Sequence, residues 1–473
     1  MWFVKMDQKI TATLFELAAK SLLSSEPIVM HALEKIPGGL FVPLFSTAFL
    51  GGHKKILKAM VRVWPFHCLH LGSLKAQESY YDILEAMIDG LPIPPAQNSS
   101  SRGHKLRILD LRHRSNCKIT CSHVRITFPF CLQSCKYSRH AVRNLENTQH
   151  RARCLEIGNS GSEVESAQET MELLVNISLS NTLRAQQFLT FLCNKVEQSS
   201  GFLHLCCRDL RINRMSTNRH ILQILDLGCI NHLEMDQAYL NEIITLFAGM
   251  IHLHSLSLSN IPFRSYKGRN FRFFLILLGQ LENLQELRLS FFYLRDQLHK
   301  LLRVLPPHMD TLCLPFCGLS IRDVSFLSQS SQATQLRVLN LNNNNFFSEA
   351  YEPFQVLLEK VSGTIQRLEI NNCMMTDSTL LAIIPTLNRC VHLRVFNFAF
   401  NPITMPVLKS LLQRLTSLPR LRHVIYPVPV HCYQEQNFYH SLNRQKLAEV
   451  QAQVKAMLHM LHQDHVQWAT YSD

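Results

Sequence analysis

The chain has 473 residues, of which 47% are apolar, and it contains no run of 18 consecutive apolar residues. This length and composition exclude a disulfide-stapled miniature fold and a transmembrane helix, and they are typical of a folded globular protein. Fifteen cysteines without paired spacing, and opening residues without a secretory pattern, predict a reducing compartment, the cytoplasm or the nucleus. Much of the net charge of +13 lies between residues 102 and 153, where twelve Lys or Arg stand against two acidic residues.

Residues 1–95 predict a small helical domain. Apolar residues recur at spacings of three and four from Thr13 onward, which is the pattern of an amphipathic helix, and Pro or Gly ends the helical stretches that follow. The expected helices cover residues 13–24, 29–35, a stretch from Leu40, 55–64 and 80–90.

Residues 96–167 predict one repeat strand, LRILDLRH, followed by a basic and aperiodic insertion. Two cysteine pairs and nearby histidines in this segment could serve as zinc ligands. These residues are Cys117, Cys121, Cys131, Cys135, His113, His123 and His140. Paired structural ligands more often lie two residues apart, so we assign no metal and no cofactor to the chain. We favour a solvated loop over a nucleic-acid contact or a nuclear import signal, because the basic residues form no compact run.

Residues 168–430 predict the main domain, in which one pattern recurs. LQELRLSFF, MDTLCLPFC, LRVLNLNNN, IQRLEINNC and LRVFNFAFN carry apolar residues at positions 1, 4 and 6 and Asn, Cys or Phe at position 9. The copies start 25, 27, 29 and 28 residues apart, which is the signature of a leucine-rich repeat. A helix over residues 183–196 precedes three looser copies, FLHLCCRDLRI, INHLEMDQA and LHSLSLSNI.

The alternating residues in the middle of each copy predict a strand with one apolar face. A single strand cannot bury this face, but stacked copies pair into a curved parallel sheet that helices cover on the outside. At position 9, Asn344 or Asn401 can satisfy backbone groups at the bend after the strand. Cys317 and Cys373 occupy the same position and are expected to be small buried thiols.

The predicted fold class is therefore α/β, a leucine-rich-repeat solenoid shaped as a horseshoe and preceded by a small N-terminal helical domain. Residues 431–473 are expected to cap the open end of the stack with a helix over 442–461 and a short strand, HVQWAT. The sequence contains no Gly-rich phosphate loop, nucleophile elbow, or carboxylate or histidine cluster at motif spacing, so we predict that the protein is not an enzyme. Two LxxLL stretches, residues 298–302 and 408–412, match the motif that nuclear receptors bind, but solenoid helices must bury leucines at the same spacing.

Six stretches outside the insertion follow one another along the chain: ELAAKSLL, LEKIPGGLFVPLF, LKAMVRVWPF, LHLCCRDLRI, LLEKVSGTIQRLEINNC and YPVPVHCY. Together they resemble signature stretches of the PRAME (preferentially expressed antigen in melanoma) family of leucine-rich-repeat proteins. The resemblance covers residues 12–110 and 168–470. Members of this family are known as substrate receptors of cullin-2 ubiquitin ligases, and some as repressors of retinoic-acid-receptor signalling in germline or tumour cells.

The resemblance implies an elongin-binding box, in which Thr, Ser or Pro precedes a Leu, a small residue and an apolar residue at fixed spacing. The matching residues are Thr13, Leu14, Ala18 and Leu22. On a helix the last three form one stripe, with Leu14 as the anchor and Ala18 small enough to admit a partner closely.

The resemblance also implies a cullin-2 box, which begins with an apolar residue and Pro and continues with two further apolar positions. The matching residues are Ile36, Pro37, Leu40 and Leu44. Either box alone matches many core helices. Their order and their place before the repeats make the pair the stronger prediction.

We therefore predict the substrate-recognition subunit of a cullin-2 ubiquitin ligase. Its N-terminal helices would bind elongin B/C, through elongin C, and cullin-2, and its concave face would bind an unidentified target protein rather than a small molecule or a membrane. Strand alternation assigns to this face Glu286, Arg288, Asn340, Asn342, Arg367, Glu369, Asn371 and Asn397. The resemblance implies roles in the negative regulation of differentiation, apoptosis and transcription. The alternatives are a corepressor that binds a nuclear receptor, such as the retinoic acid receptor, and an interaction scaffold without a ligase.

Overall fold

The computed structural model describes residues 14–71, 81–91, 105–112, 130–131, 171–179, 183–213, 219–266, 269–348, 350–433, 442–461 and 466–470. The chain divides into two compact units, Met1–Arg208 with Arg219–Asp226 and Asp209–Asn218 with Leu227–Asp473. The boundary falls inside strand β5 (Leu203–Ile212). Apart from a two-residue strand, the predicted insertion over 116–163 and its cysteines lie outside the described residues.

The N-terminal helices of the first unit confirm the predicted helical region. Pro27 lies in the first turn of its helix, where a missing N–H group is harmless. Phe41 and Phe45 pack edge-on against Trp64, with ring centroids 5.6 and 5.1 Å apart, and all three side chains are buried. The helices are α1 (Leu14–Leu23), α2 (Glu26–Ala32), η1 (Leu33–Lys35), α3 (Gly38–Leu50), α4 (Lys54–Arg62) and α5 (Tyr81–Asp89).

The first unit also contains strands, in the order β5-β4-β2-β1-β3. Strand β2 (Ile108–Asp110) confirms the repeat strand that was predicted before the insertion. It pairs in parallel with β1 (Cys68–His70) and β4 (Met171–Leu179), neither of which was predicted, and β3 (Phe130–Cys131) pairs antiparallel with β1. Helix α7 (Leu183–Gln198), which was predicted, and α8 (Arg219–Ile224) complete this unit.

In the second unit every strand pairs in parallel with its neighbour in the chain, from the end of β5 to β14. The leucines at position 4 of the repeats are in register, since Leu256 pairs with Leu287 and Leu339 pairs with both Leu312 and Leu368. All five are at most 1% exposed. The strands are β6 (His232–Asp236), β7 (Ser255–Ser259), β8 (Glu286–Ser290), β9 (Thr311–Cys313), β10 (Val338–Asn340), β11 (Arg367–Glu369), β12 (Val395–Asn397), β13 (His423–Ile425) and β14 (Gln467–Ala469).

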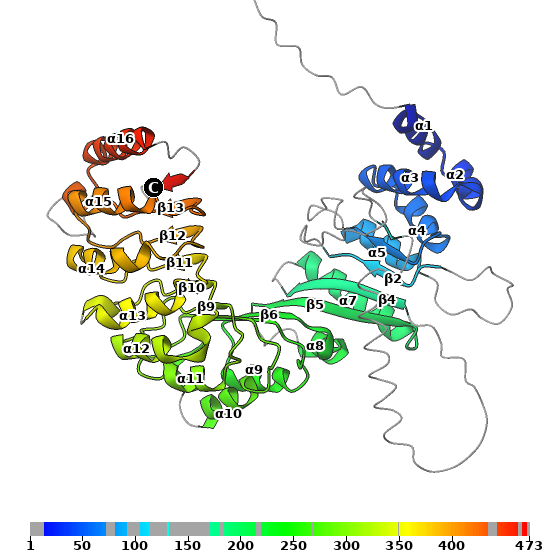
Figure 1. Ribbon diagram of the computed structural model, residues 1–473. Helices are drawn as coiled ribbons and strands as arrows, with labels where there is room; N and C mark the ends of the chain where they lie inside the picture. Colours follow the sequence, from blue (N-terminus) through cyan, green and yellow to red (C-terminus); the bar gives the residue numbers. More distant parts are fainter. Residues whose placement is uncertain are drawn as a thin grey trace, which may run out of the picture. The chain divides into compact units, whose positions relative to one another are not determined.

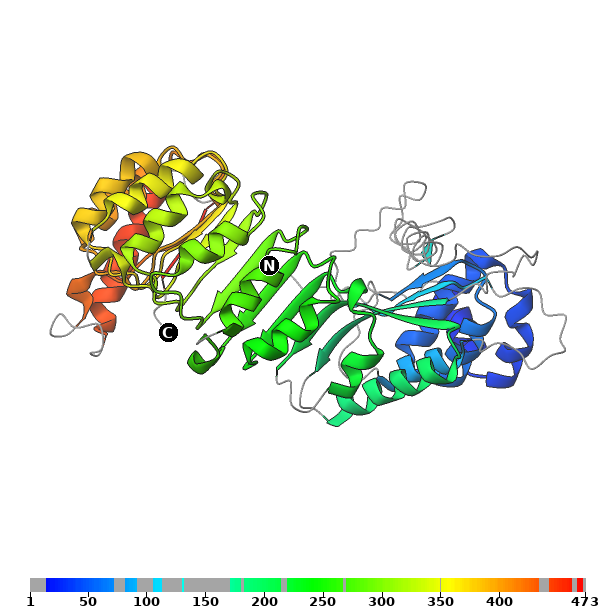
Figure 2. The same cartoon turned by 90° about the horizontal axis from the view of Figure 1, so that it is seen from below.

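The helices of this unit lie along one side of its sheet (Figures 1 and 2), and we call the opposite side the open face. They are α9 (Leu240–Phe247), α10 (Arg269–Leu278), α11 (Leu298–Val304), α12 (Ile321–Gln329), α13 (Glu352–Val361), α14 (Asp377–Leu387), α15 (Met405–Leu415) and α16 (Arg444–Met460). Short 3-10 helices are η4 (Leu227–Cys229), η5 (Phe263–Tyr266), η6 (Ser331–Thr334), η7 (Phe346–Ser348) and η8 (Val430–Cys432). The capping helix α16 and strand β14 confirm the predicted end of the stack. Among the described helices, none combines the length and apolarity needed to cross a bilayer.

The asparagines at position 9 satisfy backbone groups at the bends, as predicted, and they also link neighbouring repeats. The side-chain oxygen of Asn344 accepts hydrogen bonds from the backbone N–H groups of Cys317 and Leu319, at 3.1 and 3.0 Å, in the preceding repeat. Its amide nitrogen donates to the carbonyls of Leu314 and Leu341, both at 2.9 Å. Each such asparagine therefore satisfies groups that the bend removes from the sheet's hydrogen-bond ladder.

The position-9 cysteines are buried, as predicted. The thiols of Cys317 and Cys373 each donate to a backbone carbonyl of an earlier repeat at 3.2 Å, and both residues are 0% exposed. Burial raises the pKa of each thiol to about 12, so both are neutral at physiological pH. They act as small core residues.

Replacing Asn401 by Ala is expected to destabilise the second unit. The backbone N–H groups of Cys373 and Met375, which donate to the Asn401 oxygen at 3.1 and 3.0 Å, would lose their acceptor in a buried bend. We expect the free energy of unfolding to fall by at least about 2 kcal/mol, measured by denaturant titration. Asn345→Ala, at an exposed position of the loop after β10, is the control. Equal effects of the two substitutions would contradict this account.

Candidate protein-interaction surfaces

Helix α1 exposes most of the predicted elongin-binding stripe. Leu14 is 85% exposed, Ala18 is exposed and Leu22 is half-buried, whereas Ala19 and Leu23 on the other side of the helix are buried. The box's first residue, Thr13, lies outside the described residues. An amphipathic helix normally turns its apolar residues inward, so an exposed apolar stripe indicates a docking surface.

The exposed apolar surface extends to neighbouring positions of the same helical region. Leu17 of α1 is 54% exposed, and Ile28 and Met30 of α2 are 60% and 49% exposed. Helix α1 packs against α2 and α3, so these side chains lie on adjacent elements. This group of residues was not predicted, because helical periodicity alone does not show which side of a helix faces the core.

The predicted cullin-2 box spans the start of helix α3 and is only partly accessible. Pro37 is exposed and Leu40 is 49% exposed, whereas Ile36 is half-buried and Leu44 is 3% exposed. Leu44 is next to Phe45, whose ring packs against Trp64, so Leu44 belongs to the core of the unit. In this box, the accessible residues are Pro37 and Leu40.

The predicted target-binding residues lie along strands β8 to β12 of the second unit. On β8, Glu286 and Arg288 point to the same face, with a carboxylate oxygen and a guanidinium nitrogen 3.6 Å apart. On β10 and β11, the amides of Asn340 and Asn342 donate to the carboxylate of Glu369 at 3.0 and 3.2 Å. A guanidinium nitrogen of Arg367 lies 3.4 Å from the same carboxylate. The open face is therefore an ordered polar network.

Two of the eight predicted residues offer little surface. Asn371 and Asn397 are 8% and 5% exposed, so fewer of the predicted residues are accessible on the open face than strand alternation predicted. The Asn371 N–H donates to the Asn342 side chain at 2.7 Å, and the Asn397 oxygen accepts from the Ala399 N–H at 3.4 Å. Alternation predicts which face a residue occupies, but it does not show how closely neighbouring strands cover that residue.

An exposed aromatic cluster lies in the loops after strands β7 to β9 and was not predicted. Phe291 and Phe316 are 50% and 44% exposed, and their rings stack with centroids 4.3 Å apart. Phe263 and Tyr293 are 56% and 47% exposed, and their rings meet edge-to-face at 5.4 Å. Exposed aromatic side chains in contact with one another are typical of the central residues of protein interfaces.

The backbone at this cluster is strained. Phe291 and Phe316 occupy position 8 of their repeats with φ of 52° and 56°, a region that bulky residues rarely adopt. Other repeats place Asn260, Asn343 and Asn372 at the same position, with φ between 49° and 59°. Asparagine tolerates this conformation. A phenylalanine at position 8 of two consecutive repeats is the sequence signal that could have identified the cluster.

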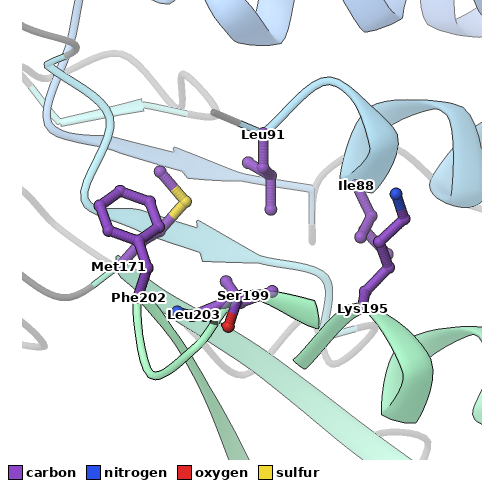
Figure 3. A pocket seen from close by; sticks show the side chains of 7 residues that line it. All are labelled: Ile88, Leu91, Met171, Lys195, Ser199, Phe202 and Leu203. Atoms are coloured by element: carbon purple, nitrogen blue, oxygen red, sulfur yellow. Dashed lines mark hydrogen bonds between the residues drawn. The ribbon is translucent and has the colours of Figure 1, made fainter. Parts of the chain in front are cut away.

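The cavity in Figure 3 belongs to the core of the first unit. It encloses about 10 Å³, which is at most room for one water molecule, and its lining consists of Ile88, Leu91, Met171, Lys195, Ser199, Phe202 and Leu203. The Ser199 hydroxyl donates to the Val196 carbonyl and accepts from the Leu203 N–H, so its hydrogen bonds are satisfied. The Lys195 ammonium lies 2.5 Å from a carboxylate oxygen of Asp89. This cavity is a packing gap rather than a ligand site.

A buried charged cluster in the same unit has a structural role. His70 Nδ1 lies 3.0 Å from one Asp110 oxygen, and Arg112 donates to both carboxylate oxygens at 2.8 Å. Burial opposes ionisation, but the hydrogen bonds from Arg112 and His70 outweigh it and lower the pKa of Asp110 to about 2. The cluster ties the end of β1 to the end of β2, and its stabilisation is lost only as the pH falls below the ordinary pKa of Asp toward 2.

The LxxLL leucines are core residues of the stack. Leu298 and Leu301 of α11, and Leu408, Leu411 and Leu412 of α15, are 0% exposed. A receptor groove would need these side chains free, so either helix would have to leave the stack before docking. This burial counts against the nuclear-receptor alternative.

The fold and its exposed surfaces define a leucine-rich-repeat protein of the interaction type rather than a member of an enzyme family. The chain belongs to the PRAME family: the PRAME N-terminal domain matches residues 11–117 and the PRAME C-terminal domain matches residues 171–472. It is 31% identical to leucine-rich repeat-containing protein 14 of Mus musculus over 97% of each chain. It is 30% identical to PRAME family member 20 of Homo sapiens over 89% of this chain and 86% of that protein. Among solved structures, it is similar to a chain in the crystal structure of the Rad7 and Elc1 complex in yeast, with 16% identity, a TM-score of 0.38 and coverage of 59% of this chain and 76% of that one.

Replacing Phe316 by Asn is expected to leave the second unit as stable as the wild type. The substitution gives position 8 the residue that three other repeats use, and it relieves a strained backbone while it removes an exposed ring stack. We expect the free energy of unfolding to change by less than about 1 kcal/mol, whereas Phe292→Ala, at a 0% exposed position, should lower it by about 3 kcal/mol or more. Denaturant titration compares the two variants. A similar loss for both would show that the exposed ring is structural.

Proposed function

We propose that this protein is the substrate receptor of a cullin-2 ubiquitin ligase. The observation that carries the proposal is the exposed apolar stripe of α1, where the anchor Leu14 is 85% exposed and Ala18 leaves room for a close approach. An apolar stripe that is exposed in the free protein marks a surface that a partner covers in the complex. The match of the PRAME N-terminal domain to residues 11–117 supports elongin C as that partner, because the resemblance to this family implies an elongin-binding box at these positions.

The first unit would bind the ligase subunits, and the second unit would bind the target protein. Helix α1 would dock into an apolar groove of elongin C, and the accessible part of α3, Pro37 and Leu40, would contact cullin-2. The open face of the second unit and its aromatic cluster would hold the target protein. Aromatic anchors beside a hydrogen-bonded polar surface are typical of protein recognition sites and differ from the deep apolar pockets that bind small molecules. The proposal assigns no catalytic residue, because the chemistry would belong to the assembled ligase.

Replacing Leu14 by Asp is expected to abolish association with elongin C. A charged carboxylate would have to enter an apolar groove without a partner, so we expect the amount of co-purified elongin C to fall at least tenfold. Affinity purification followed by mass spectrometry measures this amount together with that of cullin-2. Because Leu14 is 85% exposed, the thermal midpoint should not change.

Lys20→Asp is the matched control for this experiment. Lys20 is an exposed residue of the same helix, on a different side from Leu14, so the control introduces the same carboxylate outside the stripe. Retention of elongin C by Lys20→Asp and its loss from Leu14→Asp support the box. Equal retention by the two folded variants would remove the elongin assignment.

Replacing Leu40 by Asp is expected to separate the two ligase partners. Leu40 is 49% exposed at the start of α3, so the variant should fold, keep elongin C and lose cullin-2 by at least about fivefold. Leu50→Asp, at a 65% exposed position at the other end of the same helix, is the control. Quantitative co-precipitation of both partners decides the result, and unchanged cullin-2 recovery from Leu40→Asp would place the cullin contact elsewhere.

A further inference from the structure

Three arginines and one glutamine directly precede strands β10 to β13 at one edge of the second unit's sheet. These residues are Arg337, Gln366, Arg394 and Arg422. Backbone hydrogen bonds join each of them to the next. The N–H groups of Gln366, Arg394 and Arg422 donate to the carbonyl of the preceding member at 2.7, 2.8 and 2.9 Å. Since neighbouring strands lie about 4.8 Å apart, the row from Arg337 to Arg422 spans about 14 Å.

The three arginines that directly precede strands, Arg337, Arg394 and Arg422, are exposed. Among the residues that the structure describes, none forms an ion pair or a side-chain hydrogen bond with Arg337, Arg394 or Arg422. Arg367, the first residue of β11, adds a fourth guanidinium, whose side chain is 51% exposed. We call Arg337, Arg367, Arg394 and Arg422 the arginine row.

Two acidic residues lie beside the arginine row, Glu369 and Asp310. The Glu369 side chain is 18% exposed, and its carboxylate is contacted by Arg367 and by the amides of Asn340 and Asn342. Asp310, one strand earlier, accepts a hydrogen bond from the hydroxyl of Thr311 at 2.9 Å. Among the described residues, neither of these carboxylates forms an ion pair with Arg337, Arg394 or Arg422, so these three guanidinium groups are available to an acidic group of a partner.

We propose that the arginine row binds an extended acidic segment of a partner protein. In an extended chain, alternate side chains point the same way about 6.6 Å apart, so three acidic residues at alternate positions span about 13 Å. This length matches the row from Arg337 to Arg422. Guanidinium groups bind carboxylates through paired hydrogen bonds, which makes arginine better suited to this task than lysine. The inference names the kind of target segment that this edge of the second unit's sheet takes, and so it rests on the proposed function.

The surroundings of the arginine row favour a peptide over single-stranded nucleic acid. Nucleic-acid strands are held by phosphate contacts together with aromatic rings on which bases stack. The exposed rings of Phe291, Phe316 and Phe400 follow strands β8, β9 and β12, and so they lie at the opposite edge of the sheet from residues that precede the strands. The row itself is flanked by Val338 and Val395, which begin β10 and β12.

Fluorescence anisotropy with the full-length protein tests the inference. The probe is a fluorescein-labelled heptapeptide with glutamate at its second, fourth and sixth positions and glycine or serine elsewhere. The comparison ligands are the same peptide with lysine in place of glutamate, and a labelled oligouridylate. We expect the acidic peptide to bind, its affinity to fall with rising salt, and the lysine peptide not to bind.

Charge reversal in the arginine row identifies the binding site. Arg394→Glu and Arg422→Glu should each weaken binding of the acidic peptide at least about fivefold. Arg322→Glu, an exposed arginine in the first turn of outer helix α12, makes the same charge change away from the row and should bind as the wild type does. Equal weakening by all three variants would show a general charge effect and overturn the assignment. Tighter binding of oligouridylate than of the acidic peptide would also overturn it.

Elongin C recovery separates this inference from the proposed function. Arg394→Glu and Arg422→Glu should co-purify with as much elongin C as the wild type, because both residues lie in the repeats and far along the chain from α1. Failure of the acidic peptide to bind a protein that still recovers elongin C would remove the inference alone. Loss of elongin C from the wild type, with the peptide still bound to the arginine row, would remove the ligase role alone.

Discussion

Asn344 and Asn401 hold the repeats together at the point where each strand bends. The oxygen of each side chain accepts hydrogen bonds from two backbone N–H groups of the preceding repeat. The amide nitrogen donates to one backbone carbonyl of that repeat and to one of its own repeat. One side chain therefore fixes the bends of two repeats relative to each other. Position 8 adopts a positive φ in repeat after repeat, so its side chain lies at the same edge of the sheet in each. The register that places the arginines in line at the other edge follows from the same stacking.

The exposure of the leucine side chains distinguishes the elongin-binding box of α1 from the LxxLL stretches of α11 and α15. Leu14 and Ala18 follow the same helical spacing as the leucines of α11 and α15, and pattern alone cannot distinguish the two cases. The structure places the first pair in solvent and buries the LxxLL leucines of both later helices, which are at most 7% exposed. The difference arises from what packs against each helix: α11 and α15 lie between neighbouring repeat helices, whereas α1 packs against α2 and α3 with one side and exposes Leu14 on another. This contrast supports the elongin box over the nuclear-receptor motif.

Much of the fold could be predicted from the sequence, because each repeat carries its own apolar pattern and the copies reinforce one another. The N-terminal helices, the strands from β5 to β13 and the capping helix all have such local signals. Strand β1 has none, since Cys68, Leu69 and His70 become a strand only by pairing with a segment 40 residues further along the chain. The accessible and buried parts of the candidate sites were not predictable for the same reason. Exposure at Leu40 and burial at Leu44, Asn371 and Asn397 depend on neighbours that are distant in sequence.

Hydrogen–deuterium exchange on the purified chain, with and without recombinant elongin B/C, tests the central claim most directly. Exchange reports the protection of backbone amides segment by segment, so it locates the contact without a substitution. The account predicts that elongin B/C slows exchange in α1 and in the adjoining turn before α2, while the strands β8 to β12 exchange at the same rate as in the free protein. Absence of a complex, or protection confined to the repeat strands, would contradict the assignment of α1 as the ligase-binding surface.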